Sequence, residues 1–129
     1  NTRLQVEHGV TEAVTGVDLV EWMLRTAAGD TGFLDGFRYA PCGHAVQVRL
    51  YAEDPGKQFQ PAAGLVTAAA FPDDIRVDTW IETGIEVSPY YDPLLAKLIT
   101  HGPDRPTAIA AMRRALANTA VHGFETNQA

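Results

Sequence analysis

The sequence predicts an α+β fold in which a mostly antiparallel sheet is closed by one helix. Several short segments alternate apolar and polar residues with a period of two, which is typical of half-buried strands. Two longer stretches repeat apolar residues at intervals of three and four, which is typical of amphipathic helices. The composition of 46% hydrophobic and 20% charged residues over 129 positions is sufficient for a packed core.

The first seven residues alternate polar and apolar side chains and predict a half-buried strand. Side chains two residues apart on a strand project from one face about 6.5 to 7 Å apart, so Arg3, Gln5 and Glu7 would form one wall. That wall would present a cation, an amide and a carboxylate able to accept a proton. Asn1 would add a neutral oxygen of the kind that Mg²⁺ accepts. On the pattern alone, a strand whose polar face meets water is the simpler interpretation.

A helix is expected over residues 18–28, where apolar residues recur at helical spacing and Gly29 offers a C-terminal stop. Residues 11–14 are expected to form a shorter turn before it. Residues 29–43 are rich in Gly, Asp and Pro and lack periodicity, which indicates a connection between two units. We therefore place the boundary near Pro41, between residues 1–40 and 41–129.

Alternation returns over residues 44–52 and predicts a strand whose polar face carries Arg49. Residues 53–64 hold two Pro and two Gly and are expected to form an ordered but irregular loop. The β-branched and aromatic content then predicts three more strands. These strands are expected over residues 65–71, 75–81 and 94–100.

The last element is expected to be an alanine-rich helix that ends near Asn118. Pro106 follows Asp104 at a first helical position, where its missing N–H costs no hydrogen bond. The apolar face of this helix would be formed by Ile109, Met112, Ala115 and Leu116.

The charge and cysteine content exclude several classes of protein. A net charge of -6 disfavours a nucleic-acid partner, since affinity for phosphates depends on Lys and Arg. The single cysteine, Cys42, excludes an internal disulfide and a cysteine-rich zinc site, so we expect a cytoplasmic protein. No window approaches the roughly 18 to 20 apolar residues that cross a bilayer, and we expect no membrane partner. The first residues lack Met and read as a start inside a longer protein.

Several strings in the sequence resemble the biotin carboxylase family, which makes carboxybiotin from ATP, bicarbonate and biotin. Asn-Thr-Arg-Leu-Gln-Val-Glu-His-Gly-Val-Thr-Glu at 1–12 and Thr-Gly-Val-Asp-Leu-Val at 15–20 resemble the end of its ATP-grasp domain. Gly-His-Ala-Val-Gln-Val-Arg-Leu-Tyr-Ala-Glu-Asp-Pro at 43–55 resembles the start of its C-terminal domain, and Tyr-Tyr-Asp-Pro-Leu-Leu-Ala-Lys-Leu at 90–98 a later signature. The resemblance implies that residues 1–40 end an ATP-grasp domain and that residues 41–129 form a biotin carboxylase C-terminal domain.

Shorter strings look most like urea carboxylase, the carboxylase part of urea amidolyase. They are Phe-Gln-Pro at 59–61, Val-Asp-Thr-Trp at 77–80 and His-Gly at 101–102. The longer strings are shared with acyl-CoA and pyruvate carboxylases, so a biotin carboxylase subunit of such an enzyme stays the alternative. Gln-Pro-Ala-Ala-Gly at 60–64 departs from the Ser-containing loop that is usual in the family.

The resemblance implies a role for each residue of the first segment. Glu7 would be the general base that deprotonates bicarbonate, so that its oxygen can attack the γ-phosphate of ATP and form carboxyphosphate. Arg3 would bind bicarbonate, and Gln5 and the backbone of Val6 would complete the pocket. Asn1 would approach the catalytic Mg²⁺.

The resemblance also implies that Arg49 binds biotin and stabilises charge. Carboxyphosphate would break down to CO₂ and phosphate, and the phosphate would remove the N1 proton of biotin, leaving an enolate-like charge on the ureido oxygen. A fixed cation such as Arg49 would stabilise this charge. Without the flanking string, Arg49 would read as an ordinary surface arginine.

The sequence contains no glycine-rich phosphate loop and no Met-Lys-Met biotinylation motif. The chain by itself is therefore expected to be inactive and not to carry biotin. The resemblance implies that the cofactors of the complete module are ATP, Mg²⁺ and a biotin attached to a separate carrier domain. Expected partners are the rest of the ATP-grasp module, the biotin carboxyl carrier domain, the carboxyltransferase domain and a second copy of the complete module in a homodimer. The alternative is a non-catalytic assembly module, which an upstream ATP-grasp sequence would argue against.

Overall fold

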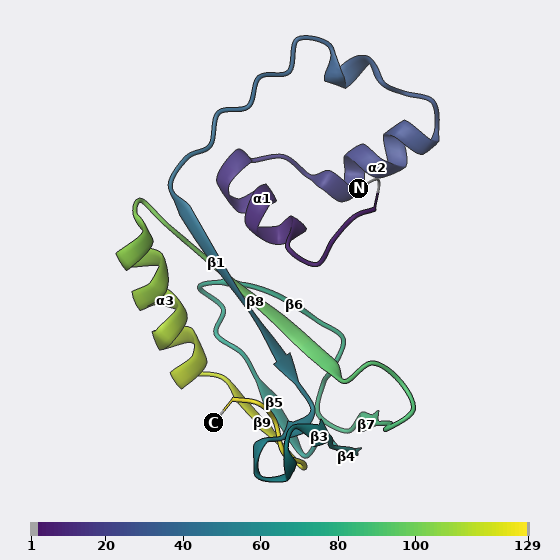
Figure 1. Cartoon of the computed structure of the whole chain (residues 1–129), viewed down its shortest axis with the longest axis vertical. Helices are drawn as coiled ribbons and strands as arrows, with labels where there is room; N and C mark the ends of the chain where they lie inside the picture. Colours follow the sequence, from purple (N-terminus) through teal and green to yellow (C-terminus); the bar gives the residue numbers. More distant parts are fainter. Residues whose placement is uncertain (1–2, 129) are drawn as a thin grey trace.

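The structure, a computed structural model, describes residues 3–128 (Figure 1). Two helices and a long connection precede a sheet region that ends with a third helix and a short strand. The helices are α1 (His8–Thr15), α2 (Leu19–Ala27) and α3 (Arg105–Ala117), with 3-10 turns at Gly32–Leu34 and Pro55–Lys57. The strands are β1 (His44–Tyr51), β2 (Glu53–Asp54), β3 (Gln60–Pro61), β4 (Gly64–Leu65), β5 (Ala68–Ala70), β6 (Arg76–Thr79), β7 (Glu86–Val87), β8 (Leu94–Gly102) and β9 (Ala120–His122).

The main sheet is antiparallel and has the strand order β1-β8-β6. Strand β8 lies in the centre and pairs with β1 from His44 opposite Gly102 to Tyr51 opposite Leu94. Its other edge pairs with β6. The remaining strands form three antiparallel pairs, β2 with β3, β4 with β7 and β5 with β9. The predicted α+β class and the mostly antiparallel sheet are confirmed.

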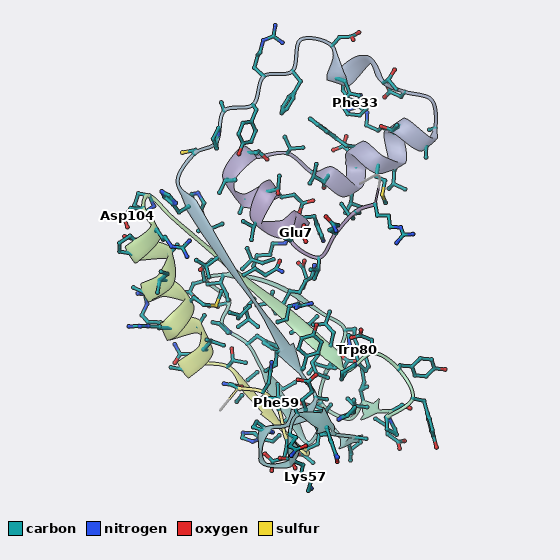
Figure 2. All side chains as sticks on the ribbon, in the orientation of Figure 1. Glu7, Phe33, Lys57, Phe59, Trp80 and Asp104 are labelled. Carbon is teal, nitrogen blue, oxygen red and sulfur yellow. The ribbon has the colours of Figure 1, made fainter. Side chains whose placement is uncertain are left out.

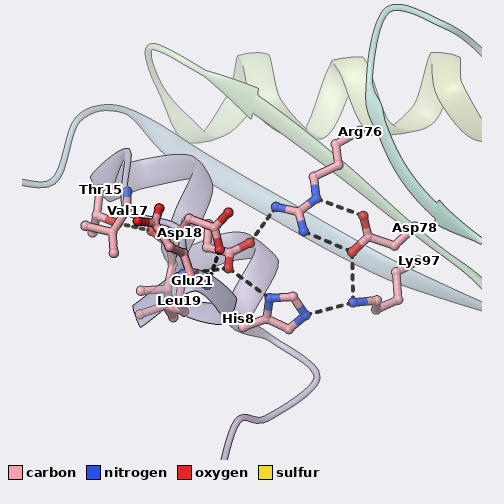
Figure 3. A network of polar contacts seen from close by, with 11 residues as sticks. His8, Thr15, Val17, Asp18, Leu19, Glu21, Arg76, Asp78 and Lys97 are labelled. Atoms are coloured by element: carbon pink, nitrogen blue, oxygen red, sulfur yellow. Dashed lines mark hydrogen bonds and ion pairs between the residues drawn. The ribbon is translucent and has the colours of Figure 1, made fainter. Parts of the chain in front are cut away.

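Two layers cover opposite faces of β1 and β8. On one face, helix α3 packs over the core, where Leu98 and Met112 are buried. On the other face lies α1, whose Gly9 approaches Ile99 of β8 and Gln47 of β1 (Figures 1 and 3). Side chains alternate along β1, so the residues on the odd positions of this strand project toward the side of α1.

The predicted helices are confirmed, and their ends show why they form. Asp18 caps α2, since its side chain accepts from the N–H of Glu21, and Asp104 caps α3 by accepting from the N–H of Thr107. Helix α2 nevertheless buries none of its residues, and Leu24 remains 65% exposed. The turn predicted at residues 11–14 is part of the longer helix α1.

The strand predicted at the start of the chain is wrong for the residues that the structure describes. Residues 3–7 form a bend and a turn, and all five are exposed. No strand among residues 3–128 pairs with them, so their backbone forms local hydrogen bonds instead, from the N–H of His8 to Gln5 O and from the N–H of Val10 to Glu7 O. Asn1 lies outside the described residues.

The other predicted strands are present, but one is divided. The stretch 65–71 begins with the last residue of β4 and contains β5, and the two strands pair with different partners. The loop at residues 53–64 contains the two-residue pair of β2 and β3 around a turn that Asp54 stabilises by accepting from the N–H of Gly56. Strands β7 and β9 were not predicted from the sequence. Among the helices of residues 3–128, none has the length and apolar character to cross a membrane.

Candidate functional site

The segment before α1 brings three of the predicted site residues together. Arg3, Gln5 and Glu7 line one hollow of about 160 Å³, which His8, Thr11 and Leu19 close from the side of α1 and α2. The three side chains therefore share a site, although they do so on a turn and not on one face of a strand. A cation and a carboxylate at one hollow are suited to an anion that must lose a proton.

Glu7 is at the N-cap position of α1, immediately before its first turn (Figure 2). Its carbonyl accepts from the N–H of Val10, while its side chain makes no capping hydrogen bond. The carboxylate is exposed and is not used by the helix, which leaves it available as a proton acceptor.

Arg49 lies on β1 and does not line the hollow that contains Glu7. Its guanidinium lies 5.3 Å from the centre of the Tyr51 ring, and it lines a second hollow of about 420 Å³ with Asn127 and Gln128. Lys97 is its partner across the strand pair, so both side chains project from the same sheet face. The sheet face with Arg49 is thus the one against which α1 packs.

A closed ring of five side chains joins α1 to this sheet face (Figure 3). Lys97 Nζ lies 2.9 Å from Asp78 Oδ2 and 3.1 Å from His8 Nε2. His8 Nδ1 lies 3.2 Å from Glu12 Oε1, and Glu12 Oε2 accepts from Arg76 Nη1 at 2.6 Å. Arg76 closes the ring by donating to both carboxylate oxygens of Asp78, at 2.8 and 3.1 Å.

The ring holds its two carboxylates in the ionised form. Burial raises the pKa of Glu12, but the hydrogen bond from Arg76, the adjacent His8 and the hydrogen bond from the N–H of Leu19 lower it more, so the pKa lies below its ordinary value of 4.5. For Asp78, burial is likewise outweighed by Arg76 and Lys97, and the pKa lies below 3.8. Hydrogen bonds to Asp78 and Glu12 in turn raise the pKa of Arg76.

No group of three or more His, Cys, Asp or Glu side chains within residues 3–128 could hold a metal ion. A Mg²⁺ ion that bridges carboxylates and nucleotide phosphates would need few protein ligands. The residue predicted to approach it, Asn1, belongs to the part of the chain that the structure does not describe. The prediction for Asn1 therefore stays a prediction.

Comparison with protein families supplies the decisive observation. Residues 47–129 match the family model of the biotin carboxylase C-terminal domain, which is more than half of the chain. Residues 1–32 match the ATP-binding domain of the carbamoyl-phosphate synthase L chain. The chain belongs to the biotin carboxylase family.

Curated relatives place the chain among the biotin-dependent carboxylases. Urea amidolyase of Saccharomyces cerevisiae is 53% identical over 127 residues, which are 98% of this chain and 7% of that protein. The mitochondrial methylcrotonoyl-CoA carboxylase subunit alpha of Rattus norvegicus is 47% identical over 130 residues, again 98% of this chain and 18% of the relative. The chain thus spans less than a fifth of these relatives.

Solved structures agree with this membership of the biotin carboxylase family. The urea amidolyase of K. lactis has a TM-score of 0.96 at 52% identity, with 99% of this chain and 8% of that chain covered. The biotin carboxylase domain dimer of Hydrogenobacter thermophilus 2-oxoglutarate carboxylase, in complex with MgADP, ADP and bicarbonate, has a TM-score of 0.90 at 41% identity, with 99% and 29% covered.

The sequence did not single out His8, Lys97 and Asn127, which organise the surroundings of the predicted residues. His8 carried a usable signal, because a residue four positions from Glu12 on a helix can contact it. Lys97 and Asn127 carried none, since their partners lie 89 and 76 or more residues away along the chain.

Proposed function

We propose that this chain contributes to a biotin carboxylase module that converts biotin, bicarbonate and ATP into carboxybiotin. The observation that carries the proposal is the meeting of Arg3, Gln5 and Glu7 at one hollow. The similarity to a biotin carboxylase domain crystallised with MgADP and bicarbonate supports the same substrates. The chain spans only a small share of its relatives, so the complete activity requires residues beyond it.

In this proposal, Glu7 accepts the proton of bicarbonate, and the oxygen that is freed attacks the γ-phosphate of ATP, which forms carboxyphosphate and releases ADP. Arg3 holds the anion through its guanidinium, while Gln5 and the backbone of Val6 orient it. Asn1 contributes a neutral oxygen near Mg²⁺. Magnesium would supply neutralisation of phosphate charge, and these residues bind and orient the bicarbonate beside it.

Arg49 acts on the second half of the reaction. Carboxyphosphate breaks down to CO₂ and phosphate, and the phosphate takes the N1 proton of biotin, which then attacks CO₂ through N1. The loss of the proton places negative charge on the ureido oxygen, and an arginine on a strand is a preorganised cation for that charge. The biotin would be presented by a carrier domain, and a carboxyltransferase domain would take the carboxyl group onward. A homodimer of the complete module is the expected assembly, in keeping with the dimer of a related domain.

Urea is the carboxyl acceptor that we propose for the complete enzyme. The identity to urea amidolyases reaches 53%, compared with 47% for the methylcrotonoyl-CoA carboxylase subunit. An acyl-CoA or pyruvate carboxylase is the alternative, and it would have the same chemistry at Glu7. The acceptor can be assigned by measuring ATP cleavage that depends on each candidate acceptor.

The test of the proposal is Glu7→Gln in the complete carboxylase. The amide has the size of the carboxylate but cannot accept the proton, so bicarbonate-dependent ATP cleavage should fall on the order of 100-fold or more. Glu82→Gln is the matched control, because Glu82 is exposed in the turn before β7, away from the hollow. Equal activity in the two variants would refute the role of Glu7.

A further inference from the structure

We propose that Lys97 is a positioning residue that fixes Glu7 of the helix segment relative to Arg49 of the sheet. The inference rests on the proposed function and adds to it a residue that touches no substrate. Glu7 and Arg49 lie 42 positions apart in the sequence, and Lys97 would keep the distance between their side chains constant.

Lys97 is held firmly. It lies on β8, which is paired on both edges, and its side chain is only 14% exposed. Its ammonium is anchored by Asp78 Oδ2 at 2.9 Å, and Asp78 is itself fixed by two hydrogen bonds from Arg76. The position of Nζ is therefore set by the sheet.

The segment with Glu7, in contrast, lies outside the sheet. Residues 3–7 are exposed and make no strand pairing with any residue among 3–128. The next two residues contact the sheet, since His8 Nε2 lies 3.1 Å from Lys97 Nζ and Gly9 lies against Ile99. The contact between His8 and Lys97 is thus a polar attachment to the sheet at the residue next to Glu7.

The same lysine is the cross-strand partner of Arg49. Two cations opposite each other on one sheet face repel, and Asp78 offsets the charge of Lys97. Lys97 consequently contacts the residue next to Glu7 while it lies beside Arg49. A shift of Lys97 would move Glu7, the proposed general base, relative to Arg49, the cation proposed to stabilise the biotin enolate.

The ring also dictates the tautomer of His8. An ammonium group has three donors and no acceptor, so Lys97 requires His8 Nε2 to be the acceptor. The proton of the neutral imidazole is then on Nδ1, which is buried and lies 3.2 Å from Glu12 Oε1 without the geometry of a hydrogen bond. This tautomer gives the inference a spectroscopic signature that is independent of any activity.

The first experiment reads this signature in the 129-residue chain labelled with ¹⁵N at histidine. Two-bond proton–nitrogen correlations should show His8 with the proton on Nδ1, and Lys97→Met should shift His8 toward the Nε2 tautomer. His101, whose Nε2 contacts the carbonyl of Cys42, is the internal control and should not change. A proton on Nε2 of His8 in the unsubstituted chain would overturn the inference.

The second experiment measures bicarbonate-dependent ATP cleavage in the complete carboxylase. Lys97→Met should lower kcat on the order of 10- to 100-fold, because a small displacement of a base is costly, while the KM for ATP stays constant. Lys97→Arg, which keeps a cation and donors, should recover part of the rate. Lys57→Met is the matched control, since Lys57 pairs with Asp54 far from α1 and is 73% exposed.

A double substitution separates positioning from stability. His8→Ala and Lys97→Met should not be additive in kcat, because either one breaks the same contact. Each variant is assayed well below its melting temperature. If Lys97→Met matches Lys57→Met while Glu7→Gln is inactive, only the inference fails; if Glu7→Gln is fully active, the proposed function fails first.

Discussion

Arg76 of β6 donates from Nη1 to Glu12 Oε2 of α1 at 2.6 Å and so joins the helix segment to the sheet. The same guanidinium makes a bidentate contact with Asp78. Planar bidentate pairs of this kind are among the stronger ion pairs in proteins. The two parts of the chain are therefore coupled through ionised carboxylates, and their coupling should depend on pH.

We predict that acid weakens the attachment of α1 to the sheet. The folded-state pKa values of Glu12 and Asp78 lie below their ordinary values of 4.5 and 3.8. A depressed carboxyl pKa stabilises the folded state above the unfolded value, and this contribution is lost as the pH falls through the folded value. The free energy of unfolding, measured with urea between about pH 7 and pH 3, should thus fall below about pH 4.5.

The control for this prediction is Arg76→Met, which removes the cation that depresses both pKa values. The difference in unfolding free energy between the unsubstituted chain and Arg76→Met should be largest near neutral pH and should narrow in acid. A difference that stays constant over the whole range would show that Arg76 stabilises the chain by packing alone.

The sequence predicted those elements whose partners also carried a clear pattern. Residues 44–52 and 94–100 alternate, and they pair with each other as β1 and β8. The alternation over residues 1–7 predicted a strand as well, yet a strand requires a neighbouring ladder, and the described residues 3–7 have none. Strand β9 has three residues, too few for a period to be recognised.

The candidate site likewise contains residues that the sequence predicted and residues that it did not. Arg3, Gln5 and Glu7 were found through strings along the chain and do meet at one hollow. The attachment of that segment depends on Lys97 and Arg76, which come from distant strands. A period of two places a side chain on a face but does not say which helix covers that face.

We predict that Asn127→Ala loosens the C-terminal segment from the free edge of β1. Asn127 Oδ1 accepts from the N–H of Tyr51 at 2.9 Å, and its Nδ2 donates to the carbonyl of Arg49 at 3.2 Å. Loss of these partners should lower the free energy of unfolding by about 1 to 3 kcal/mol. Urea unfolding of Asn118→Ala provides the comparison, since that exposed side chain makes no hydrogen bond to residues 3–128; an equal loss there would contradict the prediction.

We predict that Arg49→Gln separates the two halves of the reaction in the complete carboxylase. Carboxybiotin formation should fall on the order of 100- to 1000-fold, because the amide lacks the charge that stabilises the biotin enolate. Bicarbonate-dependent ATP cleavage should fall much less, since it precedes this step. Both rates are measured in one reaction, with Arg113→Gln on the exposed side of α3 as the control. Equal losses in the two rates would place Arg49 in the first half.

We predict that the 129-residue chain by itself does not cleave ATP. Nucleotide phosphates are commonly held by a lysine or by a loop of backbone N–H groups. The sequence has two lysines and no glycine-rich phosphate loop. Lys57 is paired with Asp54 at 3.1 Å and Lys97 with Asp78 at 2.9 Å, so neither ammonium is available without breaking an ion pair.

The measurement is phosphate release by highly purified chain with Mg²⁺, ATP and bicarbonate, with and without free biotin. The rate should equal that of a Glu7→Ala preparation purified in the same way, because any trace of contaminating ATPase would be common to both. A rate above that of Glu7→Ala would mean that the turn before α1 can bring bicarbonate and ATP together without further residues. Glu7 would then deprotonate bicarbonate beside a nucleotide held by this chain alone, and the requirement for additional phosphate-binding residues would be wrong.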